Sequence, residues 1–81
     1  MIKVVFFASL RERLAISEVE LEYTNQQSVN DVIASLQTND ARYTILTEQD
    51  VLTALNHTLC AYEESVKDGD EVAFFPPVTG G

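Results

Sequence analysis

Apolar residues along this chain recur at two different spacings, and the shorter spacing predicts β-strands. Five short segments either are rich in β-branched and aromatic residues or alternate apolar with polar residues, as strands do. These segments are residues 2–8, 18–23, 51–55, 59–62 and 71–75. Turn-forming residues at 56–58 and 67–70 separate the last three of them. The pattern therefore predicts a β-sheet.

The longer spacing, close to one helical turn, predicts helices. An apolar stripe with the i, i+3, i+4, i+7 spacing begins directly after Ser28, a good N-cap residue, and Asp31 lies in its first turn. The members of the stripe are Val29, Val32, Ile33 and Leu36. Ser9 and Glu12 have the spacing of a capping box, which predicts a second, short helix through Ala15.

The segment between the long helix and the third strand is less regular. We expect a short helical stretch over residues 40–46, with Tyr43 and Leu46 facing inward, and a polar loop at residues 47–50. The element order is then strand, short helix, strand, long helix, two short strands and a final strand. This order predicts an α+β roll in which the long helix packs across one face of a mixed sheet.

The first and last predicted strands are apolar on both faces. Side chains alternate across a strand, and one helix covers only one face of a sheet. A chain of 81 residues has little other material for the second face, so we expect an exposed apolar patch that binds a partner. The patch consists of Val5, Phe7, Ala73 and Phe75, flanked by Lys3 and Glu71. The alternative is that both strands are central and buried on both faces.

The charge of the chain restricts its partners. Thirteen acidic and five basic residues give a formal net charge of −8. Such a field repels phosphate backbones and anionic membrane surfaces, so neither nucleic acid nor a membrane is expected as a partner. A basic protein surface is the expected partner, although acidity also serves simply to keep a small protein in solution.

Cys60 is the only cysteine, so the chain forms no internal disulfide and assembles no thiolate metal site. It lies in an apolar run, and we assign it no role. No apolar run approaches the ~20 residues that a membrane span needs. We expect a soluble protein in a reducing cytoplasm.

Residues 76–81 are expected to form a flexible tail on a folded domain of residues 1–75. Two prolines open the tail and cannot continue a strand ladder, and six extended residues span roughly 20 Å. Gly80 and Gly81 lack a Cβ atom, so their backbone fits a channel too narrow for other residues. The tail therefore suits delivery of its α-carboxylate into a partner's active site. The alternative is a frayed chain end without function.

Two segments carry a family resemblance: DGDEVAFFPPVTGG at residues 68–81 and IKVVFFA at residues 2–8. With the length of the chain, they resemble the small subunits of molybdopterin synthase, which are ubiquitin-like sulfur carriers. The resemblance covers the whole chain, and its final string is far more restrictive than a diglycine alone. It implies a β-grasp roll with a mixed sheet, a long helix on one face and a flexible C-terminal tail.

The resemblance also implies a function carried by the C-terminus. An adenylyltransferase of the ubiquitin-activating type would use ATP to adenylate the Gly81 carboxylate, and a sulfur donor protein would supply the sulfur of a thiocarboxylate. The tail would then enter the large subunit of the synthase and donate sulfur to cyclic pyranopterin monophosphate in molybdenum cofactor biosynthesis. Family members form a heterotetramer, with two small subunits at opposite ends of a large-subunit dimer. This chain is expected to bind no cofactor or metal and to be non-catalytic alone.

These arguments assign two groups of functional residues. The reacting end is Gly81, next to Gly80. The partner-binding residues are Val5, Phe7, Ala73, Phe75, Pro76, Pro77, Val78, Thr79 and, on the resemblance alone, Arg11. Two rival functions stay open: another diglycine carrier or modifier that serves thiamine, tRNA thiolation or protein conjugation, or an interaction module whose tail is inert.

Overall fold

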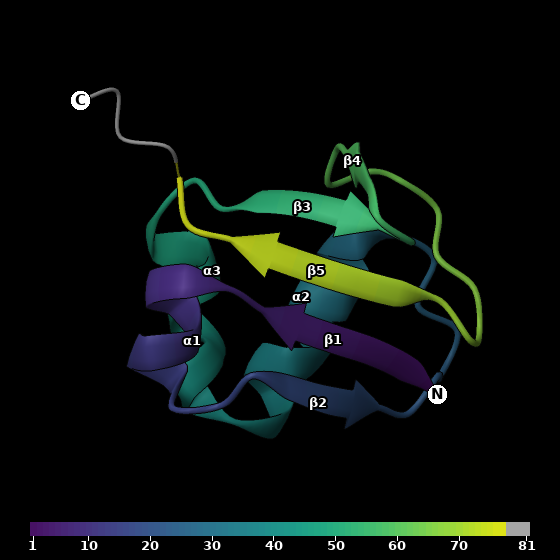
Figure 1. Ribbon diagram of the computed structural model, residues 1–81. Coiled ribbons are helices and arrows are strands. Elements are labelled where there is room, and N and C mark those ends of the chain that lie inside the picture. Colours follow the sequence, from purple (N-terminus) through teal and green to yellow (C-terminus); the bar gives the residue numbers. More distant parts are fainter. Residues whose placement is uncertain (78–81) are drawn as a thin grey trace.

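The computed structural model describes residues 1–77, and within them five strands form one mixed sheet (Figure 1). The strand order is β2–β1–β5–β3–β4, with β1 and β5 parallel and the other neighbouring pairs antiparallel. The strands are β1 (Ile2–Phe6), β2 (Glu18–Leu21), β3 (Leu52–Leu55), β4 (Thr58–Cys60) and β5 (Glu71–Phe75). The first and last strands of the chain thus lie side by side in the middle of the sheet.

The helices of the described residues gather on one side of this sheet, where α2 crosses behind the strands (Figure 1). They are α1 (Ala8–Leu14), α2 (Val29–Asn39), the 3₁₀ helix η1 (Ala41–Thr44) and α3 (Ile45–Glu48). Buried residues from all four helices and from β1, β2 and β5 form a single hydrophobic core. The predicted roll, with a long helix on one face of a mixed sheet, is confirmed.

Strand alternation places the side chains of β1 and β5 as the sequence predicts. Every second residue faces the helices, and these residues are at most 1% exposed. They are Ile2, Val4, Phe6, Val72 and Phe74. The Phe6 ring stacks on Tyr43 and on Phe74, with centroids 5.7 and 5.9 Å apart. The apolar stripe of α2 is buried in the same core.

The N-terminus of α2 is capped as the sequence predicts. The Ser28 hydroxyl accepts a hydrogen bond from the backbone N–H of Asp31 at 3.4 Å. The Asp31 carboxylate in turn accepts one from the backbone N–H of Gln27 at 2.8 Å. A helix start leaves several N–H groups without helical partners, and this reciprocal pair satisfies one of them and orders the chain just before the helix.

The first helix differs from its prediction. α1 begins at Ala8 with Phe7 as the N-cap residue, and no side chain caps it. Ser9 therefore lies inside the first turn, so the capping box predicted for it is wrong. The backbone makes the turn instead, with a φ of +53° at Ala8. The helix ends at Leu14, one residue early, because Ala15 takes the left-handed conformation of a C-cap at φ +58°.

The helical segment between α2 and β3 is longer than predicted. A loop was expected from residue 47, but α3 continues through Glu48. The Asp40 carboxylate accepts a hydrogen bond from the Arg42 N–H at 2.9 Å and so caps η1. Tyr43 and Leu46 are buried, as predicted. The strand predicted at 18–23 ends at Leu21, and the one predicted at 59–62 spans Thr58–Cys60, because only these residues pair with a neighbouring strand.

The β3–β4 hairpin turns through two residues with left-handed backbone, Asn56 at φ +48° and His57 at φ +72°. The Asn56 side chain holds this turn against β5. Its amide nitrogen donates to the Asp70 carboxylate and its amide oxygen accepts from the Glu71 N–H, both at 3.0 Å. Asn and His adopt the left-handed region more often than most side chains, but only glycine enters it without the steric cost of a Cβ atom.

We predict that His57→Gly raises the free energy of unfolding by about 0.5–1 kcal/mol, because glycine enters the left-handed region without a Cβ clash. The His57 side chain is 83% exposed, so its removal costs little packing. Urea unfolding of the two proteins measures the difference. Asn56→Ala is the opposing control and should lower stability, since it removes both amide hydrogen bonds. A His57→Gly protein less stable than the parent would show that backbone strain does not govern this turn.

Candidate partner-binding face

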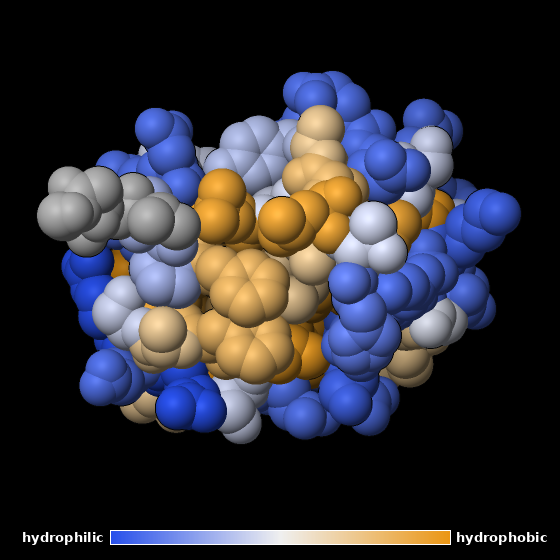
Figure 2. Space-filling model, turned by 45° about the horizontal axis from the view of Figure 1, so that its top comes forward, coloured by the Kyte–Doolittle hydropathy of each residue, from blue (hydrophilic) through white to orange (hydrophobic). Residues whose placement is uncertain are grey.

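The sheet face opposite the helices carries a continuous apolar area, which we call the apolar face. Strand register and the aromatic stacking described below arrange its side chains in two rows across the sheet. The rows are Leu52–Phe75–Phe7 and Leu59–Ala54–Ala73–Val5. Figure 2 shows an extended hydrophobic area framed by hydrophilic surface. The structure thus favours the exposed patch over strands buried on both faces.

An aromatic pair forms the centre of the first row. The rings of Phe7 and Phe75 stack with centroids 4.7 Å apart and planes 5° from parallel. The Phe7 N–H donates to the Phe74 carbonyl at 3.1 Å, which extends the β1–β5 pairing by one residue and aligns the rings. Phe7 is 39% exposed, and Phe75 is half-buried. A large apolar surface stays in contact with water at this point, which is typical of a docking site.

Ala73 lies on the predicted face, but it is only 7% exposed, so the prediction that it contributes open surface is wrong. The reason is its size and position: its side chain is a single methyl group on the central strand, between Ala54 of β3 and Val5 of β1. Ala73 lines an open hollow of about 270 Å³, whose other lining residues are Phe7, Ala54, His57, Leu59, Glu71 and Phe75. Ala73 therefore shapes a depression that fits a protruding apolar side chain.

The apolar face also contains two exposed leucines that the sequence analysis did not assign to it. Leu52 of β3 is 41% exposed and Leu59 of β4 is 70% exposed. Both belong to the hairpin that pairs with β5, so their membership depends on which strands are neighbours and in which register. The sequence does alternate apolar Leu52 with polar Thr53, as a strand with two different faces does. This alternation does not identify the neighbouring strands.

The remaining predicted site residues flank this face or lie beyond it. Arg11 is exposed on α1, the helix that directly follows Phe7. Pro76 and Pro77 continue from β5 and are half-buried, so the tail starts beside the Phe7–Phe75 pair. The other tail positions lie outside the described residues: Val78, Thr79, Gly80 and Gly81.

The titratable or nucleophilic groups that are partly or fully buried in residues 1–77 include those of Tyr43, Tyr62 and Cys60. Burial raises the pKa of Tyr43 above the ordinary phenol value, and burial with the nearby Asp50 carboxylate does the same for the pKa of Tyr62. Cys60 is half-buried, with its sulfur 3.6 Å from the Thr53 hydroxyl.

Within residues 1–77, no group of three or more potential ligands is placed to hold a metal ion. No helix of the same residues is long and apolar enough to cross a membrane.

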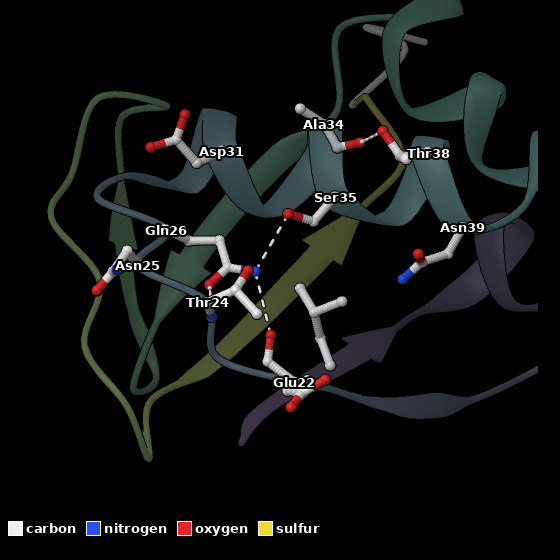
Figure 3. Close-up of a pocket in the computed structure, with 10 residues that line it drawn as sticks. Glu22, Thr24, Asn25, Gln26, Asp31, Ala34, Ser35, Thr38 and Asn39 are labelled. Carbon is white, nitrogen blue, oxygen red and sulfur yellow. Dashed lines mark hydrogen bonds between the residues drawn. The ribbon is translucent and has the colours of Figure 1, made fainter.

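A separate polar hollow lies between α2 and the loop that precedes it (Figure 3). Gln26, one of its lining residues, is 4% exposed and accepts a hydrogen bond from the Thr24 N–H at 2.7 Å. Its amide nitrogen donates to the Glu22 carbonyl at 3.2 Å and to the Ser35 hydroxyl at 3.1 Å. Gln26 thus ties the loop to α2, and we interpret this hollow as a structural junction.

Comparison with known proteins gives full-length matches. The model of the ThiS family matches residues 4–81. A protein of Haemophilus influenzae is 41% identical over the whole of both chains, and one of Escherichia coli is 40% identical, also over the whole of both chains. Both are described as molybdopterin synthase sulfur carrier subunits.

Solved structures agree with the fold. The small archaeal modifier SAMP1 of Haloferax volcanii superposes with a TM-score of 0.81 at 25% identity, covering 99% of this chain and 98% of that one. A putative molybdopterin converting factor subunit 1 of Pyrococcus furiosus gives 0.76 at 31% identity, covering 95% and 97%. The expected β-grasp, ubiquitin-like architecture is confirmed. With a family model and full-length relatives in agreement, the chain belongs to the ThiS family.

Proposed function

We propose that this chain is the sulfur-carrier subunit of a molybdopterin synthase. The observation that carries the proposal is the 41% identity to such a subunit over the full length of both chains, a match that runs through Gly81. The structure supports it with an apolar face next to the start of the tail. A carrier needs both parts, because the partner must hold the domain while the tail reaches its active site.

The reacting group in this proposal is the C-terminal carboxylate. Its pKa is about 3.3–3.7 in model peptides, so it is an anion at neutral pH and resists nucleophilic attack. Adenylation with ATP, catalysed by an adenylyltransferase, releases pyrophosphate and gives the carbonyl carbon a good leaving group. A hydrosulfide ion delivered by a donor protein then attacks this carbon and displaces AMP, which leaves the thiocarboxylate and releases a proton. Its sulfur is donated to cyclic pyranopterin monophosphate when the tail occupies the large subunit.

The apolar face is the proposed binding surface for the large subunit and for the adenylyltransferase. β5 ends at Phe75 inside the first row of this face, so residue 76 leaves the domain at the docking surface itself. A partner that covers Phe7, Phe75 and the leucines therefore contacts the point where the tail leaves the domain, so the full length of the tail is available to reach the partner's active site. We place this cycle in the cytoplasm, with ATP as a substrate of the adenylyltransferase and no cofactor bound by this chain.

A second candidate function is that of a protein modifier, because SAMP1 of Haloferax volcanii is a small archaeal modifier with a closely similar fold. Modifier and carrier share the adenylation step and differ afterwards. A modifier forms an amide bond with a lysine of another protein, whereas the carrier returns with a free carboxylate after its sulfur is donated.

Intact mass spectrometry tests the proposed function. Incubation with the adenylyltransferase, ATP and a sulfur donor should raise the mass by the difference between sulfur and oxygen, since one carboxylate oxygen is replaced. Addition of the large subunit and cyclic pyranopterin monophosphate should return the mass to its starting value and yield molybdopterin. Without ATP the mass should not change. A stable covalent product with other proteins, and no molybdopterin, would support the modifier instead.

A further inference from the structure

The face opposite the helices is apolar only in part, and its other part is charged. One row beyond Ala73 and Val5, the strand register places Glu71 of β5, Lys3 of β1 and Glu20 of β2 side by side. Glu18 of β2 pairs with Val5 and closes the end of the second apolar row. We call Glu18, Glu20 and Glu71 the acidic border. It bounds the apolar face along β2 and along the end farthest from the tail.

The acidic border is only weakly neutralised within the chain. The Lys3 ammonium lies 3.9 Å from a Glu18 oxygen and 4.0 Å from a Glu71 oxygen, at the outer limit of ion pairing. His57 lies 3.7 Å from the other Glu71 oxygen. Glu20 has no ion pair within residues 1–77. Each pair has at least one partner that is about half exposed or more, and ion pairs this long contribute little, so the border keeps a net negative charge toward an external partner.

The acidic border and the apolar face together have the arrangement of a docking surface. Protein interfaces place apolar residues in the centre and polar residues at the rim, where charges remain partly hydrated. The apolar rows form such a centre, and the acidic border forms a rim on two of its sides. The rim carries three carboxylates and one ammonium, so its net charge is negative at neutral pH. Complementarity then requires basic side chains on the partner.

We propose that the acidic border selects a partner whose apolar contact surface is bordered by lysine or arginine side chains facing β2 and the start of β5. The inference rests on the proposed function for the identity of that partner, the large subunit of the synthase. The acidic border affects mainly the rate of association, because charges at the rim of an interface change that rate and its dependence on salt. The apolar face, in contrast, limits the rate of dissociation.

A simpler explanation of the β2 carboxylates is protection of a sheet edge. β2 is an outer strand, and charged side chains on such strands discourage pairing with other chains. Edge protection predicts self-association of variants that lack Glu18 and Glu20, with an unchanged rate of binding to the large subunit. Partner selection predicts a slower association rate for protein that stays monomeric.

The test compares two double variants with the same change in net charge. Glu18→Lys/Glu20→Lys reverses the border along β2, and Glu48→Lys/Glu64→Lys reverses two exposed carboxylates away from this face. Association with the purified large subunit is followed by stopped-flow fluorescence at low and at high ionic strength. We expect the border variant to associate about tenfold more slowly at low salt, with a flatter salt dependence, and the control to stay within about threefold of the parent.

The milder pair Glu18→Gln/Glu20→Gln covers the case in which a lysine at position 20, opposite Lys3, destabilises the sheet, and it should give a smaller change in the same direction. Equal rates for border and control variants would overturn the inference and leave the proposed function intact. Self-association of the border variant with an unchanged rate would assign the carboxylates to edge protection instead. A parent protein that does not bind the large subunit at all would overturn the proposed function and this inference together.

Discussion

Phe75→Glu is expected to weaken binding to the large subunit by at least about 30-fold while the protein stays folded, since interface aromatic anchors contribute about 2 kcal/mol or more. Phe75 stacks on Phe7 at the centre of the apolar face, where its ring is half-buried in the free protein. A carboxylate there remains hydrated until a partner covers it. In the complex it would be buried opposite an apolar surface without a counter-ion, which is costly.

The neighbouring residue provides a matched control. Phe74 differs from Phe75 by one position, but it faces the helices, is 0% exposed and stacks on Phe6. Phe74→Glu should therefore unfold the protein, since it buries a charge in the core. Isothermal titration measures binding, and thermal unfolding followed by circular dichroism measures the fold. Loss of the fold in both variants would show that the ring of Phe75 belongs to the core and that our face assignment is wrong.

Much of the fold could be predicted because local patterns determine which side of an element is buried. Alternation in β1 and β5 identified the core-facing residues, and the stripe after Ser28 identified α2 and its cap. These signals depend only on backbone geometry and on the difference between apolar and polar side chains. The exposed aromatic pair followed from the same alternation, together with the small size of the chain.

The errors arose where the result depends on contacts between distant segments. Ser9 has the right spacing for a cap, but pairing of Phe7 with Phe74 fixes the N-cap two residues earlier, and the helix starts at Ala8. Ala73 lies between residues of β1 and β3, and no local pattern reveals that these strands are its neighbours. Leu59 was missed for the same reason. Burial on a sheet face depends on cross-strand neighbours as well as on alternation.

The reacting end is a different case, because its assignment came from composition and resemblance and not from packing. The described residues end at Pro77, so the geometry of the tail tip does not enter the argument. What the structure contributes is the position from which the tail departs. The half-buried prolines follow a paired strand, so the direction of departure is set by β5. The reach of the tail is then a matter of residue count.

Deletion of Gly81 is therefore expected to reduce thiocarboxylate formation and molybdopterin synthesis by at least about 100-fold, because displacing a reacting group by even 1 Å costs about that much. The shortened chain still ends in a carboxylate, but this group lies one residue, about 3.3–3.6 Å, short of its position in the parent protein. Affinity for the large subunit should change by no more than a few-fold if the apolar face provides most of the binding energy. Intact mass and a titration with the large subunit measure the two quantities separately.

Two further variants distinguish chain length from backbone width. One added glycine after Gly81 moves the carboxylate in the opposite direction and should be equally inactive, whereas an inert tail would tolerate it. Gly80→Ala keeps the length and adds only a Cβ atom, so it should reduce activity if the partner's channel contacts the backbone closely. Activity retained by both length variants would mean that the carbonyl carbon of Gly81 is not the reacting atom. Loss of activity in the length variants alone would show that reach, and not the width of the channel, makes the final residue necessary.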